Sequence, residues 1–327
     1  MDGARHSQQR KSQIGGRRGP VRGCSRGAVP GQFVGTLCFA VSAFAACVAL
    51  SAVAGAEPSS LPAECALSEP ERGTVATIND GETLTLTDGT VVRLIGTKAP
   101  AAPLGWRGDR PWPLVSEAKE ALSGLAAGAE VELRYGGTRL DRHGHALAQV
   151  FAVKGGERVW LQGELVAKGL ARVYSFPDNH ACVGDLLARE AAAREKRAGV
   201  WGVWAYRVLE ADDLGRLGRL TRSYQLVEGA VAAVGEASGR VYLNFAKEWR
   251  RDFTIVVERK DSAALKAAGL DVKALTGKRL RVRGWIEWRN GPMIRVTHAE
   301  QIELLPSATV PSGSAVEASP AAGGVEL

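Results

Sequence analysis

The order of strand and helix patterns along this chain of 327 residues predicts a β-rich α+β fold with two five-stranded barrels. Two observations support this expectation. Residues 73–100 hold short alternating runs separated by tight turns, and a helix, two strands and two helices follow them. A second set of strand patterns, which also contains a tight hairpin turn, lies within residues 222–305. We therefore expect a first domain at residues 65–205 and a second at residues 222–305.

The first domain opens with a β-hairpin. Residues 83–87 alternate polar and apolar side chains, Asp88 and Gly89 supply a tight turn, and residues 91–95 return as a strand. A second turn, which starts at Asp80, precedes this hairpin. The pattern is expected to bring acidic side chains and an arginine together at one end of a small curled sheet.

A helix is expected after the irregular loop that follows these strands. Apolar side chains recur at helical spacing from residue 114 to residue 125, and Ser116 is the expected helix cap. The remaining elements are strands at residues 130–135 and 146–153 and helices at residues 160–168 and 185–198. Three strands, a helix, two strands and two helices is the order of an oligonucleotide-binding (OB) barrel with added helices.

The second domain repeats the five-strand order. A strand is expected from Gly229, and Asn290-Gly291 makes the tight turn of the last hairpin. The other expected elements are strands at residues 240–245, 253–257, 279–288 and 293–298 and a short helix at residues 261–269. The sequence therefore predicts a second five-stranded OB barrel.

Four segments of the first domain resemble the motifs of the staphylococcal nuclease (thermonuclease) family. They are residues 73–100, DRHGHALA at 141–148, LVAKGLARVY at 165–174, and a closing segment at 190–201 that contains AREKRAGVW. The resemblance covers about residues 71–201 and implies a barrel with nuclease-type helices. The second domain is similar to modules that follow nuclease-like domains in some exported bacterial proteins.

The resemblance also implies a site. In this family two aspartates and a backbone carbonyl hold Ca²⁺, a glutamate positions the attacking water, and two arginines bind the phosphate. The corresponding residues here are Glu82 and Lys98 for the aspartates, Ala101 for the glutamate, and Arg93 and His145 for the arginines. Lysine has no lone pair to offer when it is protonated, and alanine has no polar group at all. We therefore expect a degenerate site with no cofactor, or with Ca²⁺ only if hydrolysis survives.

Several alternatives remain open for the site. Glu82 and Asp80 are the weak metal-ligand candidates, and Glu117 or Asp109 would have to supply a substitute carboxylate for a rebuilt Ca²⁺-dependent phosphodiesterase. A separate hypothesis places Lys98 in the vacated calcium position, paired with Glu82 or Asp80. In the plainer interpretation Asp80 and Asp88 only form turns, Arg93 only pairs with Glu82, and His143 and His145 are turn or surface residues. Zinc is not favoured, because no cysteine or third histidine lies near these histidines in sequence.

The N-terminal segment predicts export. Residues 1–56 carry seven basic residues and one acid, and the uncharged run from residue 33 to residue 53 ends before the small-residue pattern Ala54-Gly55-Ala56. A cleaved signal peptide would leave a periplasmic or secreted protein without stable membrane contact, and an uncleaved N-terminal anchor is the alternative. Cys65 and Cys182 would then remain as a disulfide or as two free thiols. The tail at residues 306–327 is expected to be disordered.

The remainder of the chain is nearly neutral, with 35 basic and 34 acidic residues, so composition alone does not show nucleic-acid binding. Residues 222–303 hold 15 basic and 10 acidic residues. The predicted single-strand nucleic-acid surface consists of Arg279, Arg281, Arg283 and Trp285 on one strand face, with Trp249 and Arg250 beside it. The alternative is that these arginines only form a solvated face. Nucleic-acid binding without efficient hydrolysis is therefore the leading functional hypothesis, the rebuilt phosphodiesterase is the second, and a cell-envelope protein-interaction module is the third.

Overall fold

The computed structural model describes residues 65–103, 106–248 and 252–306. All of them belong to one compact unit. The predicted leader at residues 1–56 lies outside the described residues, as do Trp249, Arg250 and nearly all of the predicted C-terminal tail. The expectations that rest on those segments stay predictions.

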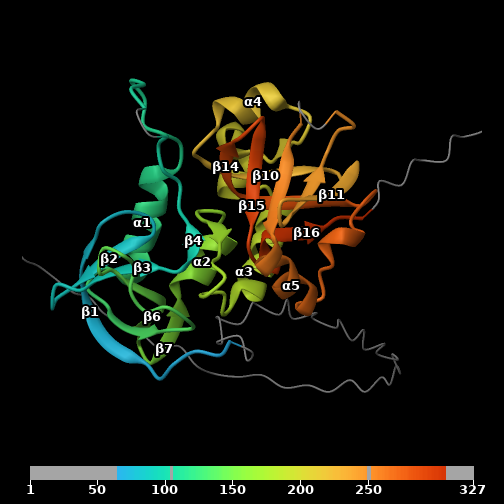
Figure 1. The fold of residues 1–327 in the computed structure, drawn as a ribbon. Helices are drawn as coiled ribbons and strands as arrows, with labels where there is room; N and C mark the ends of the chain where they lie inside the picture. Colours follow the sequence, from blue (N-terminus) through green and yellow to red (C-terminus); the bar gives the residue numbers. More distant parts are fainter. Residues whose placement is uncertain (1–64, 104–105, 249–251, 307–327) are drawn as a thin grey trace, which may run out of the picture. The chain divides into compact units, whose positions relative to one another are not determined.

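Five strands of the first region close into a barrel (Figure 1). The strands of its sheet are β1 (Glu71–Ile78), β2 (Thr83–Leu86), β3 (Val91–Leu94), β5 (Glu130–Arg134), β6 (Ala146–Lys154) and β7 (Glu157–Trp160). β1 pairs with β2 and with β5, and β5 pairs with β6. The parallel pairing of β3 with β6 completes the ring. Because strand order and direction match those of an OB barrel, the predicted fold class is confirmed here.

Three helices and a small second sheet complete this region. The helices are α1 (Val115–Ala126), α2 (Leu161–Ala167) and α3 (Val183–Glu195). The small sheet joins β4 (Gly96–Lys98) to β8 (Arg172–Tyr174) in antiparallel register. The apolar core of this region runs from Val75 to Leu186.

The predicted cap of α1 is wrong. Leu114, in a left-handed conformation with φ of 63°, precedes the helix, and no side chain caps it. Ser116 lies inside the first turn, where its hydroxyl donates to Glu117. The loop before the helix is fixed instead by a distant contact, because the Tyr206 hydroxyl donates to the carbonyl of Pro113 at 2.8 Å.

The second region forms a curled sheet with its own apolar core, from Leu209 to Ile302. Its strands are β9 (Leu209–Glu210), β10 (Tyr224–Ala230), β11 (Ala233–Ala237), β12 (Arg240–Asn244), β13 (Thr254–Glu258), β14 (Arg279–Trp288), β15 (Pro292–Val296) and β16 (Ile302–Leu304). Its helices are α4 (Leu214–Arg219) and α5 (Arg259–Ala267). Short 3₁₀ turns lie at η1 (Gly199–Gly202), η2 (Trp204–Tyr206), η4 (Val272–Ala274) and η5 (Ala299–Gln301).

The order of pairing in this sheet is that of an OB fold. β11 pairs with β12, β12 with β13, β13 with β15 in parallel, β15 with β14, and β14 with β10. Only two residues, Val231 and Ala232, separate β10 from β11. The amide of Val231 donates to the carbonyl of Lys278, and that of Ala232 donates to the carbonyl of Asn244. The two segments therefore act as one bent strand, and the expected second OB-like fold is confirmed. β9 and β16 add strands that the sequence patterns did not predict.

The predicted disulfide is present. Cys65 and Cys182 are bonded, with their Cα atoms 4.9 Å apart, so the first described residue is tied to the residue that precedes α3. Within residues 65–103, 106–248 and 252–306, no helix has the length and apolar character needed to cross a membrane.

Candidate functional site

Glu82 lies at the centre of the nuclease-like site, in the turn before β2, and is only 8% exposed. Its Oε1 accepts a hydrogen bond from Lys98 Nζ at 2.7 Å and a weaker one from Arg93 Nη2 at 3.5 Å. Its Oε2 accepts from the backbone amide of Ala99 at 2.6 Å. The carboxylate is therefore satisfied by two cations and one amide without any metal ion.

Local geometry explains why these groups meet. β2 pairs with β3 so that Thr83 lies opposite Arg93, and β4 ends at Lys98. Helix α1 packs directly on the turn at Gly81. A Cβ added to this glycine would lie only 2.8 Å from the Cβ of Ala118 on the helix. Such a separation essentially never occurs between real Cβ atoms, so this position requires glycine.

The two aspartates of the hairpin region form turns. Asp80 accepts a hydrogen bond from the backbone amide of Glu82 at 2.8 Å, and Asp88 accepts one from that of Thr90 at 2.8 Å. Such bonds are typical of Asx turns. Lys98 pairs with Glu82, which was one of the two expected partners.

The residues of this site do not fit Ca²⁺. Calcium requires six to eight oxygen ligands, and here an ammonium group lies against the acid that would supply the first of them. Ala101 has no side-chain oxygen, Asp109 and Glu117 are both exposed, and Glu117 accepts a hydrogen bond from the Ser116 hydroxyl. Among the residues that the structure describes, no group of three or more His, Cys, Asp or Glu side chains could hold a metal ion.

His145 lies in the turn before β6. Arg93 is paired with Leu147 in the parallel β3–β6 pair, so His145 is two residues before the partner of Arg93. Its Nδ1 is 3.0 Å from Asp141 Oδ2, and Asp141 Oδ1 accepts the amides of His143 and His145. Burial pushes the pKa of Asp141 upward, but these hydrogen bonds and the imidazole bring it below its usual value. His145 is thus held by an acid beside β6, where the family has an arginine.

The predicted row of solvent-facing arginines on β14 is wrong. Arg283 is 1% exposed, and its Nη2 lies 2.9 Å from Glu190 Oε1 on α3. A second acid, Glu303, also binds it. Burial alone would lower the pKa of Arg283, but the adjacent Glu190 carboxylate raises it above the usual range. This guanidinium binds the first region of the chain and is not open to a nucleic acid.

The other members of the row are also engaged. Arg281 binds Glu228 and Glu303, each at 2.7 Å, and Arg279 lies 3.3 Å from Glu228. Trp285 remains 42% exposed, and its indole nitrogen donates to the Tyr174 hydroxyl. Strand alternation correctly placed these side chains on one face, but it does not reveal what covers that face.

Sequence reasoning missed the acid that makes this contact. Glu190 belongs to the buried side of α3, with Val183, Leu186 and Ala193. These positions recur at helical spacing, so the signal was an acidic residue in an otherwise apolar helix stripe. Arg172 was missed too. It is buried and donates to the carbonyl of Tyr224 at 2.8 Å, and burial lowers its pKa.

One family comparison bears on this geometry. The family model described as "Staphylococcal nuclease homologue" matches residues 91–203. These residues form a staphylococcal nuclease-like domain. The match begins at β3, and the structure adds β1 and β2, with Glu82 between them, to the same nuclease-like barrel. The curled second sheet lies outside the matched residues. A search of curated proteins found no match for the chain.

Proposed function

We propose that this chain is an exported, nuclease-like protein that binds nucleic acid without efficient hydrolysis. The observation that carries the proposal is the 2.7 Å contact between Lys98 Nζ and Glu82 Oε1. It puts a fixed positive charge beside the carboxylate that would otherwise bind a metal ion. The nuclease-like fold at residues 91–203 supports nucleic acid as the ligand class.

Hydrolysis of a phosphodiester needs a hard cation, a base that activates water, and positive groups aimed at the developing charge. Of these three requirements, only the positive groups have support here. Arg93 keeps its place on β3 and is partly exposed, whereas Ala101 offers no base. The lysine ammonium can attract a phosphate, but it cannot activate water as a metal ion does. The arrangement therefore favours binding over cleavage.

Two features support export. The Cys65–Cys182 disulfide is of the kind that persists in oxidising compartments. The sequence pattern of residues 1–56 is that of a signal peptide. Both are consistent with a periplasmic or secreted location.

The test is cleavage of labelled single-stranded DNA by the chain that starts at Glu57, with Ca²⁺ and with a chelator. We expect no Ca²⁺-dependent turnover, together with binding that weakens as salt rises. An Arg93→Ala variant controls for a contaminating nuclease. Turnover that requires both Ca²⁺ and Arg93 would instead establish a rebuilt phosphodiesterase site. Absence of salt-dependent binding would favour the protein-interaction module, in line with the nearly neutral charge beyond residue 56.

A further inference from the structure

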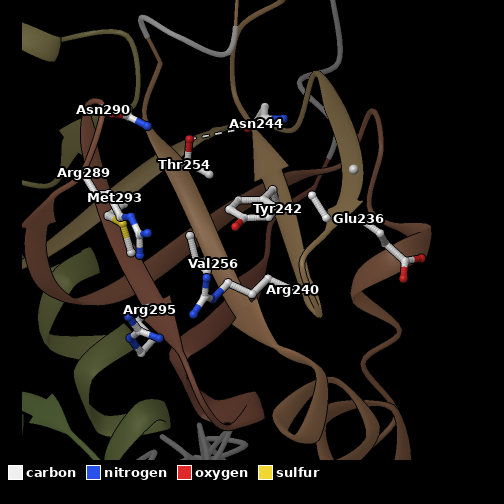
Figure 2. Close-up of a pocket in the computed structure, with 12 residues that line it drawn as sticks. Glu236, Arg240, Tyr242, Asn244, Thr254, Val256, Arg289, Asn290, Met293 and Arg295 are labelled. Atoms are coloured by element: carbon white, nitrogen blue, oxygen red, sulfur yellow. Dashed lines mark hydrogen bonds between the residues drawn. The ribbon is translucent and has the colours of Figure 1, made fainter.

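The second sheet carries a pocket of about 450 Å³ on the outer face of β11, β12, β13 and β15 (Figure 2). The nuclease-like site does not share a residue with it. Side chains from three neighbouring strands line it in rows. Tyr242, Val256 and Arg295 lie opposite one another across β12, β13 and β15.

An aromatic ring and an apolar floor form the centre of the pocket. Val256 and Met293 are each 4% exposed, and Tyr242 is half-buried beside them. Val241 and Leu243, which flank Tyr242 in sequence, are in the core. Strand alternation therefore turns the Tyr242 ring outward, and Figure 2 shows it in the middle of the pocket. A half-buried aromatic ring that points outward beside apolar side chains is suited to stacking with a planar group.

Two arginines are fixed at one edge of the pocket. Arg240 Nε lies 2.9 Å and Arg295 Nη1 lies 2.6 Å from the same oxygen of Glu258. One carboxylate thus orients two guanidinium groups, and a second acid, Glu287, lies 3.8 Å from Arg295 Nη2. The hydrogen bond that Arg240 donates to Glu258 raises the pKa of Arg240, and the neighbouring Tyr242 hydroxyl adds to this effect.

A third arginine stands at the opposite rim. Arg289 is exposed in the β14–β15 turn, and Figure 2 shows its side chain beside Met293. Within the part of the chain that the structure describes, Arg289 forms no ion pair. The only acid in the lining, Glu236, is bound by Lys273 at 2.6 Å. Glu258 and Glu287 match Arg240 and Arg295, so the unmatched positive charge of the pocket lies on Arg289, in contrast to the acid-matched arginine row on β14.

We infer that this pocket is the place where the chain binds single-stranded nucleic acid. One base stacks on Tyr242, and Arg240, Arg289 and Arg295 contact the flanking phosphates. Aromatic stacking together with phosphate neutralisation is the general basis of single-strand binding. An unpaired base is required, because the ring lies within the sheet face and a base in a duplex already stacks on its neighbours. This inference rests on the proposed function and gives it a location.

The test is fluorescence anisotropy with a labelled oligodeoxythymidine of about 12 nucleotides, a length that one OB fold can cover. The protein is the chain from Glu57 to Leu327, measured at several salt concentrations. We expect Tyr242→Ala to weaken binding about tenfold and Tyr242→Phe to retain it, because the stacking face persists. Trp204→Ala, which alters an exposed tryptophan outside the pocket, is the matched aromatic control.

The arginines are tested through the salt dependence. Arg289→Gln is expected to reduce the slope of log affinity against log salt by about 0.7, the value for one phosphate contact on a single strand. Lys196→Gln, which removes an exposed positive charge on the nuclease-like domain, should leave the slope unchanged. Because Arg289 is exposed, this measurement stays informative even if Tyr242→Ala fails to fold.

Three results would overturn parts of the inference. If the unaltered chain does not bind the oligonucleotide at any salt concentration, the proposed function itself fails. If binding persists but Tyr242→Ala and Arg289→Gln leave it unchanged, the proposed function stands and this location is wrong. If an unlabelled duplex competes as well as an unlabelled single strand, the single-strand specificity is wrong.

Discussion

At the scale of single residues, Lys98 decides which charge lies against the acid of the nuclease-like site. Its ammonium group is 2.7 Å from Glu82 Oε1, and we propose that it occupies the position of a metal ion. The pairing with Glu82 was one of two expected from the resemblance, which puts Lys98 at the position of a metal-binding aspartate, and Asp80 was the other expected partner. The contact between His145 and Asp141 could not be predicted from the sequence, because it depends on the detailed path of a turn.

This arrangement predicts the behaviour of Lys98→Asp. The variant removes the ammonium group and places two carboxylates together, so we expect it to gain Ca²⁺ affinity. The free energy of unfolding should rise by about 1 kcal/mol when Ca²⁺ is present at about five times its dissociation constant. Thermal unfolding with Ca²⁺ and with a chelator measures the effect.

Lys98→Ala is the matched control, since it removes the charge but supplies no ligand. A Lys98→Asp protein that is destabilised and does not respond to Ca²⁺ would contradict the idea that the lysine occupies the cation position.

At the scale of elements, strand β14 shows what patterning can and cannot predict. Its bounds were predicted correctly at residues 279–288, and its alternation correctly separated Val282 and Ile286 from the arginines. The face that carries the arginines contacts α3, which lies about 90 residues earlier in the chain. Periodicity is a local property, so it cannot identify a partner at that distance. The missing cap of α1 has the same origin, because Tyr206 fixes the preceding loop from afar.

The β14–α3 contact predicts a large effect for Arg283→Met. The variant removes the closer of the two cations that bind the buried Glu190 and leaves Arg194 at 3.3 Å. Removing one partner of a buried pair typically costs about 3–5 kcal/mol of the free energy of unfolding. Urea unfolding measures this loss. The double variant Arg283→Met with Glu190→Gln should recover part of it, because no unpaired charge is then buried.

Arg219→Met is a suitable control, since that arginine is exposed on α4. A loss below about 1 kcal/mol for Arg283→Met would mean that the pair is solvated and does not hold the two regions together.

At the scale of the whole molecule, polar contacts join the nuclease-like domain to the second sheet in addition to the Arg283 pair. The Tyr224 hydroxyl donates to Val173 at 2.6 Å, and Ser175 Oγ lies 2.7 Å from His298 Nε2. The repeat of the OB strand order was predictable, because each copy carries its own turns and alternation. The contact between the two OB-like regions was not predictable, because it consists of polar side chains that local patterns assign to solvent.

His298 makes the stability of the molecule depend on pH. Burial lowers its pKa from the usual 6.5 to about 4, with Glu300, His180 and Asp178 as the charged neighbours. Between these two values the unfolded chain binds a proton that the folded protein does not. The free energy of unfolding therefore falls as pH decreases through this range, by at most about 1.4 kcal/mol per pH unit.

Urea unfolding at pH 7 and pH 5 measures this dependence. We expect the dependence to be weaker in His298→Gln and largely retained in His180→Gln, since His180 is half exposed and paired with Glu300. An unchanged dependence in His298→Gln would assign the effect to other groups.

The disulfide between Cys65 and Cys182 has a further consequence for proteolysis. The two cysteines are 117 positions apart in the sequence, and the segment between them forms a covalent ring that contains the entire barrel sheet and the exposed segment at residues 106–111. A protease that cuts once within that segment opens the ring but releases no fragment, because the two ends stay joined through sulfur. The cut protein would migrate as one species until a reductant separates it into two.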